Sequence, residues 1–463
     1  MKRNALAKAT LAFLSLLSVG ASAGEYTYSI FNNSRFSDNI AESASEVEES
    51  GQSYNTGISF RILSDPSTQW QLQADGRFSR EIYSQDGLEG QNYKLFSGSL
   101  VYQPRSSNFS LRIMDELSQT PRNRFSSQSV NNVRDNNIFT VASSYFYRWG
   151  SLDRVYFDVS YSDTNSDDVA IDNGIDSDSD GQSESAIDGS RTVNEASISY
   201  ERQLNSTNLF YLFVEASEID FDADFNFTTG QGARDYEQQD AYIRWVVRGR
   251  ATRIQVDLGR SNIEDVLGYE ADAGLSEVII NRQINRTHAL EFTRRTGFDN
   301  LLDANFADNS YDLDSQANDL FSAQEITETR AAYSVSSETL NAVFSLHKSD
   351  LKSVNSTDTE ERSGFELNLS YPVSRLFHLP TESHLSYLYR LTDSDFSTSL
   401  SDITDTRSSL SRLTFTYQYN ANLALLAEIE RRSSQDKAGI EISRDTDSTS
   451  LVLGFTYSPS GRF

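Results

Sequence analysis

The clearest chemical pattern in the chain is a run of acidic side chains that begins at Asp172. Carboxylates stand at every second position, and Gly181 follows the last of them: Asp176, Asp178 and Asp180. A calcium loop takes oxygen ligands at its positions one, three and five and a turn glycine at six. Its position twelve needs a glutamate, but Ile187 stands there and Asp188 comes one residue late. The pattern favours a solvated acidic loop, and calcium binding by Asp172–Asp188 is the alternative.

Residues that could support catalysis are sparse. The chain has four histidines and no cysteine. No two histidines have the spacing of a metal-ligand pair, and no nucleophile elbow or phosphate-binding loop is present. His378 and His384 fall in a predicted turn. The sequence therefore predicts no enzyme and no catalytic, cofactor or metal site, with a hydrolase of Ser, His and acidic residues at one rim as the alternative.

The elements that position the polar side chains are strands, and the last segment shows this best. Its apolar side chains alternate with small and polar ones before the chain ends on Phe463: Leu451, Leu453, Phe455 and Tyr457. This segment resembles the closing strand of a Gram-negative outer-membrane β-barrel, whose terminal aromatic residue serves as an assembly signal. The resemblance implies the barrel assembly machinery as a partner. An amphipathic strand of a soluble sheet is the alternative.

The first 23 residues have the pattern of a secretory signal peptide. A basic start precedes the short apolar segment Leu11–Gly20, and Ala21-Ser22-Ala23 forms a small-residue cleavage site. We therefore expect export, with residues 24–463 forming the mature domain. No later segment approaches the ~20 apolar residues of a transmembrane helix. A membrane-embedded chain of this kind must be a barrel, because helices and closed barrels alone satisfy their backbone hydrogen bonds in lipid.

Alternating segments of about ten residues recur along the whole chain, as barrel strands require. We count twenty, or eighteen if the weak segments around Val278 and Leu340 are left out. The cores of the predicted strands are 26–36, 54–62, 70–78, 96–102, 109–117, 139–149, 155–161, 196–200, 210–216, 241–247, 254–258, 278–280, 290–294, 331–335, 340–346, 365–371, 385–391, 413–419, 423–429 and 451–457. The fold class predicted is all-β, a transmembrane antiparallel up-and-down barrel.

Short and long connections alternate between these segments. Turns such as 150–153, 205–208 and 419–422 follow even-numbered segments, whereas connections such as 119–137, 162–191 and 298–327 follow odd-numbered ones. Bacterial barrels have short periplasmic turns and long extracellular loops. The alternation therefore predicts that both chain ends face the periplasm. The two connections of about thirty residues are long enough to constrict the lumen.

Two neighbouring segments predict which face meets lipid. Outward residues are apolar and inward ones are polar: Ala241, Ile243, Trp245, Val247, Ile254, Val256 and Leu258 outward; Tyr242, Arg244, Arg248, Arg253, Gln255 and Asp257 inward. A charged side chain on the lipid face costs about 2–4 kcal/mol at the midplane, which fixes this register. Candidate girdle aromatics are Tyr26, Tyr145, Tyr147, Trp149, Tyr387, Tyr389, Tyr417 and Tyr419.

Composition narrows the function classes. The net charge of −27 disfavours nucleic-acid partners, and the absence of cysteine excludes a disulfide framework. The first predicted strand begins within a few residues of Gly24, which leaves no room for a plug domain. A barrel of eighteen to twenty strands is wide enough for an aqueous channel.

A short motif follows the first predicted strand, Arg35-Phe-Ser-Asp-Asn-Ile40. It resembles an element of the outer-membrane β-barrel porin family that is associated with exopolysaccharide loci. The repeated Tyr-rich strands and terminal Phe fit the same family, which supplies no catalytic residues to carry over. The resemblance implies a barrel that lets an exopolysaccharide cross the outer membrane.

The sequence thus predicts an outer-membrane conduit, most simply for secretion of an exopolysaccharide. Expected partners are outer-membrane lipid, the polymer and a separate periplasmic export protein that delivers it, and no cofactor is expected. Two other functions fit the same barrel: a general diffusion porin, and a surface adhesin or receptor whose long loops bind the partner.

Overall fold

The computed structural model describes most of the chain, apart from its first residues and several connections. The described residues are 24–40, 50–64, 69–85, 88, 90–121, 133–166, 169–171, 185–187, 190–222, 235–266, 268, 270–299, 324–353, 359–373, 383–397, 406–436 and 446–462. The predicted signal peptide, Phe463 and most of the acidic run from Asp172 lie outside this set. None of the described residues belongs to a helix long and apolar enough to cross a membrane.

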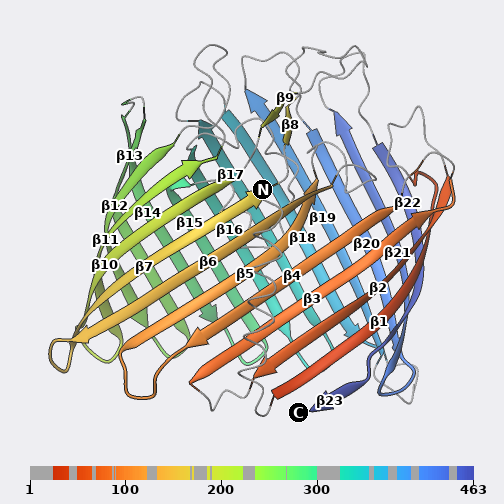
Figure 1. Cartoon of the computed structure of the whole chain (residues 1–463), viewed down its shortest axis with the longest axis horizontal. Helices are drawn as coiled ribbons and strands as arrows, with labels where there is room; N and C mark the ends of the chain where they lie inside the picture. Colours follow the sequence, from red (N-terminus) through yellow and green to blue (C-terminus); the bar gives the residue numbers. More distant parts are fainter. Residues whose placement is uncertain are drawn as a thin grey trace.

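The described residues form one closed antiparallel barrel with tilted strands (Figure 1). Its first strand, β1, pairs with β2 on one side and with β22 on the other. The strands are β1 (Gly24–Ser37), β2 (Gly51–Ser64), β3 (Trp70–Tyr83), β4 (Gln91–Tyr102), β5 (Phe109–Pro121), β6 (Val133–Arg148), β7 (Asp153–Ser166), β10 (Arg191–Gln203), β11 (Asn208–Phe221), β12 (Tyr236–Arg248), β13 (Thr252–Asp265), β14 (Glu270–Gln283), β15 (His288–Asp299), β16 (Gln324–Ser336), β17 (Asn341–Ser353), β18 (Thr359–Pro372), β19 (Ser383–Ser397), β20 (Thr406–Gln418), β21 (Leu423–Asp436) and β22 (Thr446–Tyr457).

The prediction of twenty barrel strands is confirmed. Each predicted segment coincides with one strand, although the segments 139–149, 340–346 and 413–419 each extend one residue beyond it. The weak segments around Val278 and Leu340 correspond to the full strands β14 and β17. The strands are longer than predicted, at 12 to 16 residues, because backbone pairing continues past the apolar stretch. Two features were not predicted. A short β23 (Ser460–Arg462) pairs with β1 beyond β22, and β8 (Val169–Ile171) pairs with β9 (Ser185–Ile187) as a separate small sheet.

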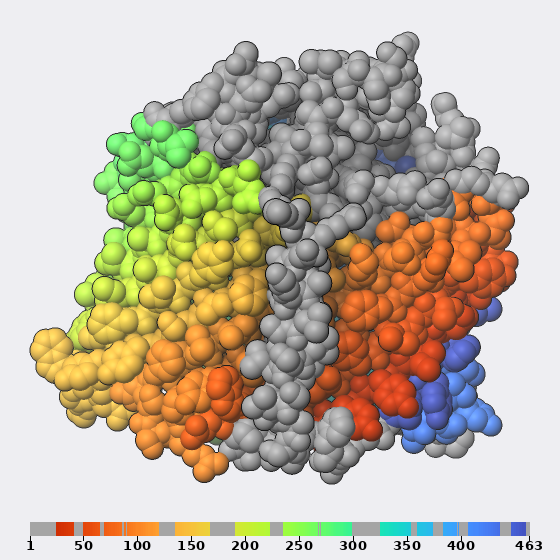
Figure 2. All heavy atoms as spheres, viewed as in Figure 1, coloured from red at the N-terminus to blue at the C-terminus, as the bar shows by residue number. Residues whose placement is uncertain are grey.

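The predicted lipid-facing residues lie on the outside of the barrel. On β22 the side chains of Leu451, Leu453, Phe455 and Tyr457 are 39 to 47% exposed, and on β13 Leu258 is exposed while Gln255 and Asp257 are buried. The tilted strands β1 to β7 form part of the outer wall in Figure 2. An outer surface of exposed apolar side chains suits a hydrocarbon environment and would promote aggregation in water.

The apolar band covers only part of each strand. Beyond it, toward the end of the barrel with the long connections, the outer face carries exposed ion pairs: Arg260–Asp272, Lys348–Glu361, Arg407–Asp393 and Arg431–Asp447. At the opposite end, which has short turns, the predicted girdle residues Tyr147, Trp149 and Tyr419 are exposed. A transmembrane apolar band is about 25 Å tall with aromatic residues at its borders. The apolar band of this barrel ends below these ion pairs, as expected if it meets lipid.

The Ser37–Ile40 element of the predicted motif joins the first strand to the last. The Asp38 amide donates to the Thr449 carbonyl at 3.2 Å, and the Thr449 amide donates to Asp38 Oδ1 at 2.6 Å. Asn39, which is fully buried, donates from Nδ2 to the Asp447 carbonyl at 3.2 Å. The motif therefore extends the seam between β1 and β22 and has a structural role in barrel closure.

Glycines on the inner face allow ring side chains to lie flat against the wall. Each of three inward glycines is the direct cross-strand partner of a ring: Gly57 of Phe31, Gly259 of Tyr242 and Gly364 of His347. A Cβ at Gly57 would stand 2.6 Å from Phe31 Cζ, and one at Gly364 would stand 2.7 Å from His347 Cε1. A larger residue at any of these positions must push the ring into the lumen.

Replacing Gly259 by Val is expected to destabilise the barrel by about 1–3 kcal/mol, the usual cost of overpacking. A Cβ there would meet Tyr242 and the Ala241 carbonyl. The matched control is Gly274→Val on β14, where no atom lies within 4 Å of an added Cβ. The readout is the temperature at which the folded form is lost on cold-loaded SDS gels. Equal temperatures for the two variants would contradict the packing account.

Candidate functional site

The inner face of the barrel carries the polar side chains that a solute would meet. One continuous set of direct cross-strand neighbours, which we call the charged row, crosses strands β7 and β10 to β16: Arg154, Glu201, Tyr211, Arg244, Asp257, Glu277, Arg295 and Glu328. It starts beside the short turn before β7 and ends near the long-connection end of β16, because neighbouring strands are staggered. The charged row therefore runs obliquely up the lumen wall.

Adjacent members of the charged row neutralise one another. Arg244 makes a two-pronged contact with Asp257, from Nε at 2.9 Å to Oδ1 and from Nη2 at 2.7 Å to Oδ2. Arg154 lies 3.2 Å from Glu201, and Arg295 lies 2.8 Å from Glu328. These pairs keep the wall strongly polar while leaving little net charge along it.

Aromatic rings lie beside the charged row on β11 and β12. Phe213 and Tyr242 stack with centroids 4.6 Å apart and planes 12° apart. The Arg244 guanidinium carbon lies 4.9 Å from the Phe213 ring centroid, and the Tyr242 hydroxyl donates to Glu215 at 3.0 Å. Rings next to charged hydrogen-bonding groups offer both apolar and polar contact to a passing solute.

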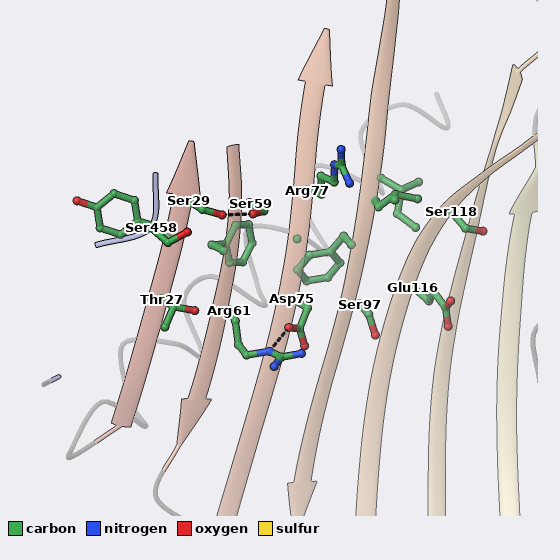
Figure 3. Close-up of a pocket in the computed structure, with 16 residues that line it drawn as sticks. Thr27, Ser29, Ser59, Arg61, Asp75, Arg77, Ser97, Glu116, Ser118 and Ser458 are labelled. Carbon is green, nitrogen blue, oxygen red and sulfur yellow. Dashed lines mark hydrogen bonds and ion pairs between the residues drawn. The ribbon is translucent and has the colours of Figure 1, made fainter. Parts of the chain in front are cut away.

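The strands β1 to β5 form a second feature of the lumen wall, which we call the hydroxyl hollow. It has a volume of about 570 Å³. Five hydroxyl side chains and four charged ones on its inner face are Thr27, Ser29, Ser59, Ser97, Ser118, Arg61, Asp75, Arg77 and Glu116. Figure 3 shows these side chains spread over adjacent strands, with a hydrogen bond between Ser29 and Ser59 and one from Arg61 to Asp75.

The two arginines of the hydroxyl hollow differ in their partners. Arg61 pairs with Asp75 at 2.5 Å. The guanidinium of Arg77 instead lies over the ring of Phe31, with its central carbon 4.3 Å from the ring centroid. Phe31 is only 5% exposed and is the cross-strand partner of Gly57. The Arg77 cation is therefore positioned by an aromatic ring and has no acidic partner among the described residues.

The described residues contain no group of three or more His, Cys, Asp or Glu that could hold a metal ion.

Among the histidines, His288 contacts the Tyr333 hydroxyl at 2.5 Å from Nδ1. The assignment of His384 to a turn was wrong, because this residue pairs with Pro372 inside β19. The backbone pairing of β19 begins before the apolar alternation from which the strand was predicted. His378 and the candidate calcium ligands Asp176, Asp178 and Asp180 lie outside the described residues.

The structure confirms the inward orientation predicted for β12 and β13 and brings Arg244 and Asp257 into contact. Sequence reasoning missed the hydroxyl hollow. The alternation of Thr27 with Ser29, of Ser59 with Arg61 and of Asp75 with Arg77 was a usable signal for inward polar residues. It gave no indication that residues of five strands line one hollow, because the stagger of neighbouring strands is not encoded in any single segment.

Comparison with known proteins gives information on the fold. No protein-family model matches the chain, and no curated protein matches it. Among solved structures, a mutant of the ferric enterobactin receptor of Pseudomonas aeruginosa is similar at 11% identity and a TM-score of 0.50, covering 95% of this chain and 81% of the receptor. The siderophore receptor PirA of Acinetobacter baumannii is similar at 10% identity and a TM-score of 0.50, covering 94% and 80%. The chain is thus a closed antiparallel barrel whose fold is similar to that of these receptors.

Proposed function

We propose that the protein is an outer-membrane conduit that passes a carbohydrate chain, an exopolysaccharide, through its lumen to the cell surface. One observation carries this proposal: a continuous, nearly neutral polar wall of charged pairs, rings and hydroxyls lies inside a barrel with an apolar outer band. Such a wall suits a solute with many hydroxyl groups and apolar ring faces. The resemblance of Arg35–Ile40 to the exopolysaccharide-associated barrels supports the same substrate.

In this mechanism the wall replaces the water around the sugar units as they move. Sugar hydroxyls donate to carboxylates such as Glu201 and accept from guanidinium groups such as Arg244, while the apolar faces of the rings contact Phe213 and Tyr242. Each contact is weak because every charged group of the row already has a protein partner. Weak, repeated contacts allow a chain to slide, whereas one tight site would hold it.

The conduit would lie in the outer membrane with its short turns toward the periplasm and its long connections toward the exterior. Its apolar band would contact lipid, the barrel assembly machinery would insert it, and a separate periplasmic export protein would deliver the polymer. The similarity of the fold to outer-membrane receptors supports this location.

Two alternatives fit the same barrel. A general diffusion porin is favoured by the paired charges of the lumen, which leave little chemical selectivity along the charged row. A receptor barrel is favoured by the similarity of the fold to two siderophore receptors. A porin admits small solutes up to a size limit whatever their chemistry, and a receptor binds one ligand tightly and passes none by simple diffusion.

Flux across lipid vesicles that contain the purified protein distinguishes these functions. We expect neutral linear oligosaccharides of six or more units to cross faster than a compact neutral solute of equal mass, because a linear chain can thread along the wall. The vesicles contain either the intact protein or no protein. A cutoff set by mass alone would support the porin, and tight binding without flux would support the receptor.

A further inference from the structure

The hydroxyl hollow contains two opposite charges without ion-pair partners among the described residues. Arg77 on β3 contacts the Phe31 ring, and the side chain of Glu116 on β5 makes no hydrogen bond or ion pair within the described part of the chain. The other two charges of the hollow, Arg61 and Asp75, neutralise each other. Other lumen carboxylates have a protein partner, either an arginine, as Asp257 and Glu328 do, or a neutral donor, as Glu215 does. An unpaired Arg and an unpaired Glu in one hollow therefore suggest that a ligand occupies it.

The strand order places the two charged groups on opposite sides of β3, because the Arg77 guanidinium lies over Phe31 on β1 whereas Glu116 stands on β5. Strand β4 lies between β3 and β5, and neighbouring strands are about 4.8 Å apart, so the two backbones are separated by about 10 Å. On β4 the inward residues at this level are Leu95 and Ser97, the cross-strand partners of Arg77 and Asp75. Figure 3 shows Ser97 on the strand between Arg77 and Glu116. Both residues on β4 are shorter than Arg and Glu, so the space between the two charges stays open toward the lumen.

Arg77 is prepared for a ligand by its neighbours. Gly57 lacks a side chain, which allows Phe31 to lie flat on the wall, and Phe31 in turn supports the guanidinium plane. A cation held over an aromatic ring keeps its N–H groups available at the edge of the guanidinium plane. Three adjacent strands therefore hold one hydrogen-bond donor group in place before any ligand arrives.

We propose that the hydroxyl hollow binds a short stretch of a neutral polysaccharide, with one hexose unit at Arg77 and another at Glu116. A hydroxyl of one unit accepts from the guanidinium and a hydroxyl of the other donates to the carboxylate, so one uncharged chain satisfies both groups. The surrounding Ser29, Ser59, Ser97 and Ser118 offer further hydrogen bonds. This assignment rests on the proposed function and adds the charge class of the substrate to it.

The charges of the hydroxyl hollow argue for a neutral sugar. An acidic sugar would gain from Arg77 but be repelled by Glu116, and an amino sugar would gain from Glu116 but be repelled by Arg77. The hollow as a whole has two positive and two negative groups: Arg61, Arg77, Asp75 and Glu116. Of these three classes, only a neutral, hydroxyl-rich sugar chain gains from both unpaired groups.

Titration calorimetry on the detergent-solubilised full chain tests the assignment, with maltohexaose as the neutral probe. We expect Arg77→Met and Glu116→Met each to weaken binding by about tenfold, as loss of a hydrogen bond to a charged group does. Met at position 77 retains contact with Phe31. The matched control is Arg407→Met on the outer face, which should bind the probe as the intact chain does. Heat conversion on gels checks that each variant is folded.

Two further measurements make the test specific. The double exchange Arg77→Glu with Glu116→Arg retains one donor and one acceptor, so it should bind maltohexaose more tightly than either Met variant. Oligogalacturonate and a chitosan oligomer of equal length should bind the intact chain more weakly than maltohexaose. Tighter binding of either charged oligomer, or unchanged binding in both Met variants, would overturn the assignment. So would the absence of binding to the intact chain.

These results separate the assignment from the proposed function. If a strain lacking the protein still secretes its polymer while maltohexaose binding depends on Arg77 and Glu116, the secretion proposal fails and the sugar site stands. If secretion is lost in that strain but both Met variants restore it and bind maltohexaose normally, the conduit stands and the site fails.

Discussion

Replacing Arg244 by Met is expected to destabilise the folded barrel by about 3–5 kcal/mol, the largest effect of any single lumen substitution considered above. Arg244 donates three hydrogen bonds to the side chain of Asp257, which is only 3% exposed. Removing the guanidinium leaves a buried carboxylate that accepts a 3.4 Å hydrogen bond from Gln255 and lies beside a second carboxylate, that of Glu277. An unpaired buried charge costs several kcal/mol because it cannot regain the solvation it has in water.

Urea unfolding of the protein in lipid vesicles measures this effect. The matched control is Arg407→Met, which removes an outward ion pair in which the arginine side chain is 54% exposed. An exposed pair contributes about 0–1 kcal/mol. A difference of less than about 1 kcal/mol between the two variants would show that the Arg244–Asp257 pair is not buried in the folded barrel. The double variant Arg244→Met with Asp257→Leu should recover much of the lost stability, because it also removes the charge.

Replacing Leu453 by Arg is expected to reduce assembly of the barrel in the membrane. Leu453 is 47% exposed on the outer face of β22, between Ala427 of β21 and Ser34 of β1. An arginine on the lipid face near the midplane costs about 2–4 kcal/mol. Because β22 and β1 close the barrel, this cost falls on the seam itself. The measurement is the amount of heat-modifiable protein in isolated outer membranes.

The adjacent residue provides the control. Val452 faces the lumen between Glu428 on β21 and Arg35 on β1, so Val452→Arg places the new cation beside one acidic and one basic side chain in a polar interior. We expect near-normal assembly of this variant. Equal loss in both variants would contradict the assignment of the two faces, whereas a defect confined to Leu453→Arg supports it.

The fold could be predicted from the sequence because each strand carries its own period-two signal. Lipid on one side and water on the other force alternation along every strand, so Ala241 to Val247 already distinguished outside from inside. Even the short segment around Val278 was sufficient to locate β14. The full length of β14 was not apparent from the sequence. Its first part, around Ala273 and Gly274, lies beyond the apolar band, where outward side chains need not be apolar.

The candidate site was much less predictable. The Arg77 cation lies over the ring of Phe31, and that ring lies flat because Gly57 has no side chain. The three residues stand on three strands and meet only at one particular stagger of those strands. The sequence also gave no structural reason for the Asp38-Asn39 pair, whose partners Asp447 and Thr449 lie at the other end of the chain. Local alternation predicts the face of a residue, whereas the cross-strand partner depends on the shear of the closed barrel.

The distribution of polysaccharide in a strain that lacks the protein tests the central proposal most directly, with the polymer assayed separately in the medium and in the periplasm. A secretion conduit predicts that polymer disappears from the medium and accumulates in the periplasm. Expression of the intact chain should restore secretion, and expression of the Leu453→Arg variant should not. An unchanged distribution in the deletion strain would contradict the proposal and leave a diffusion porin or a receptor barrel as the better account.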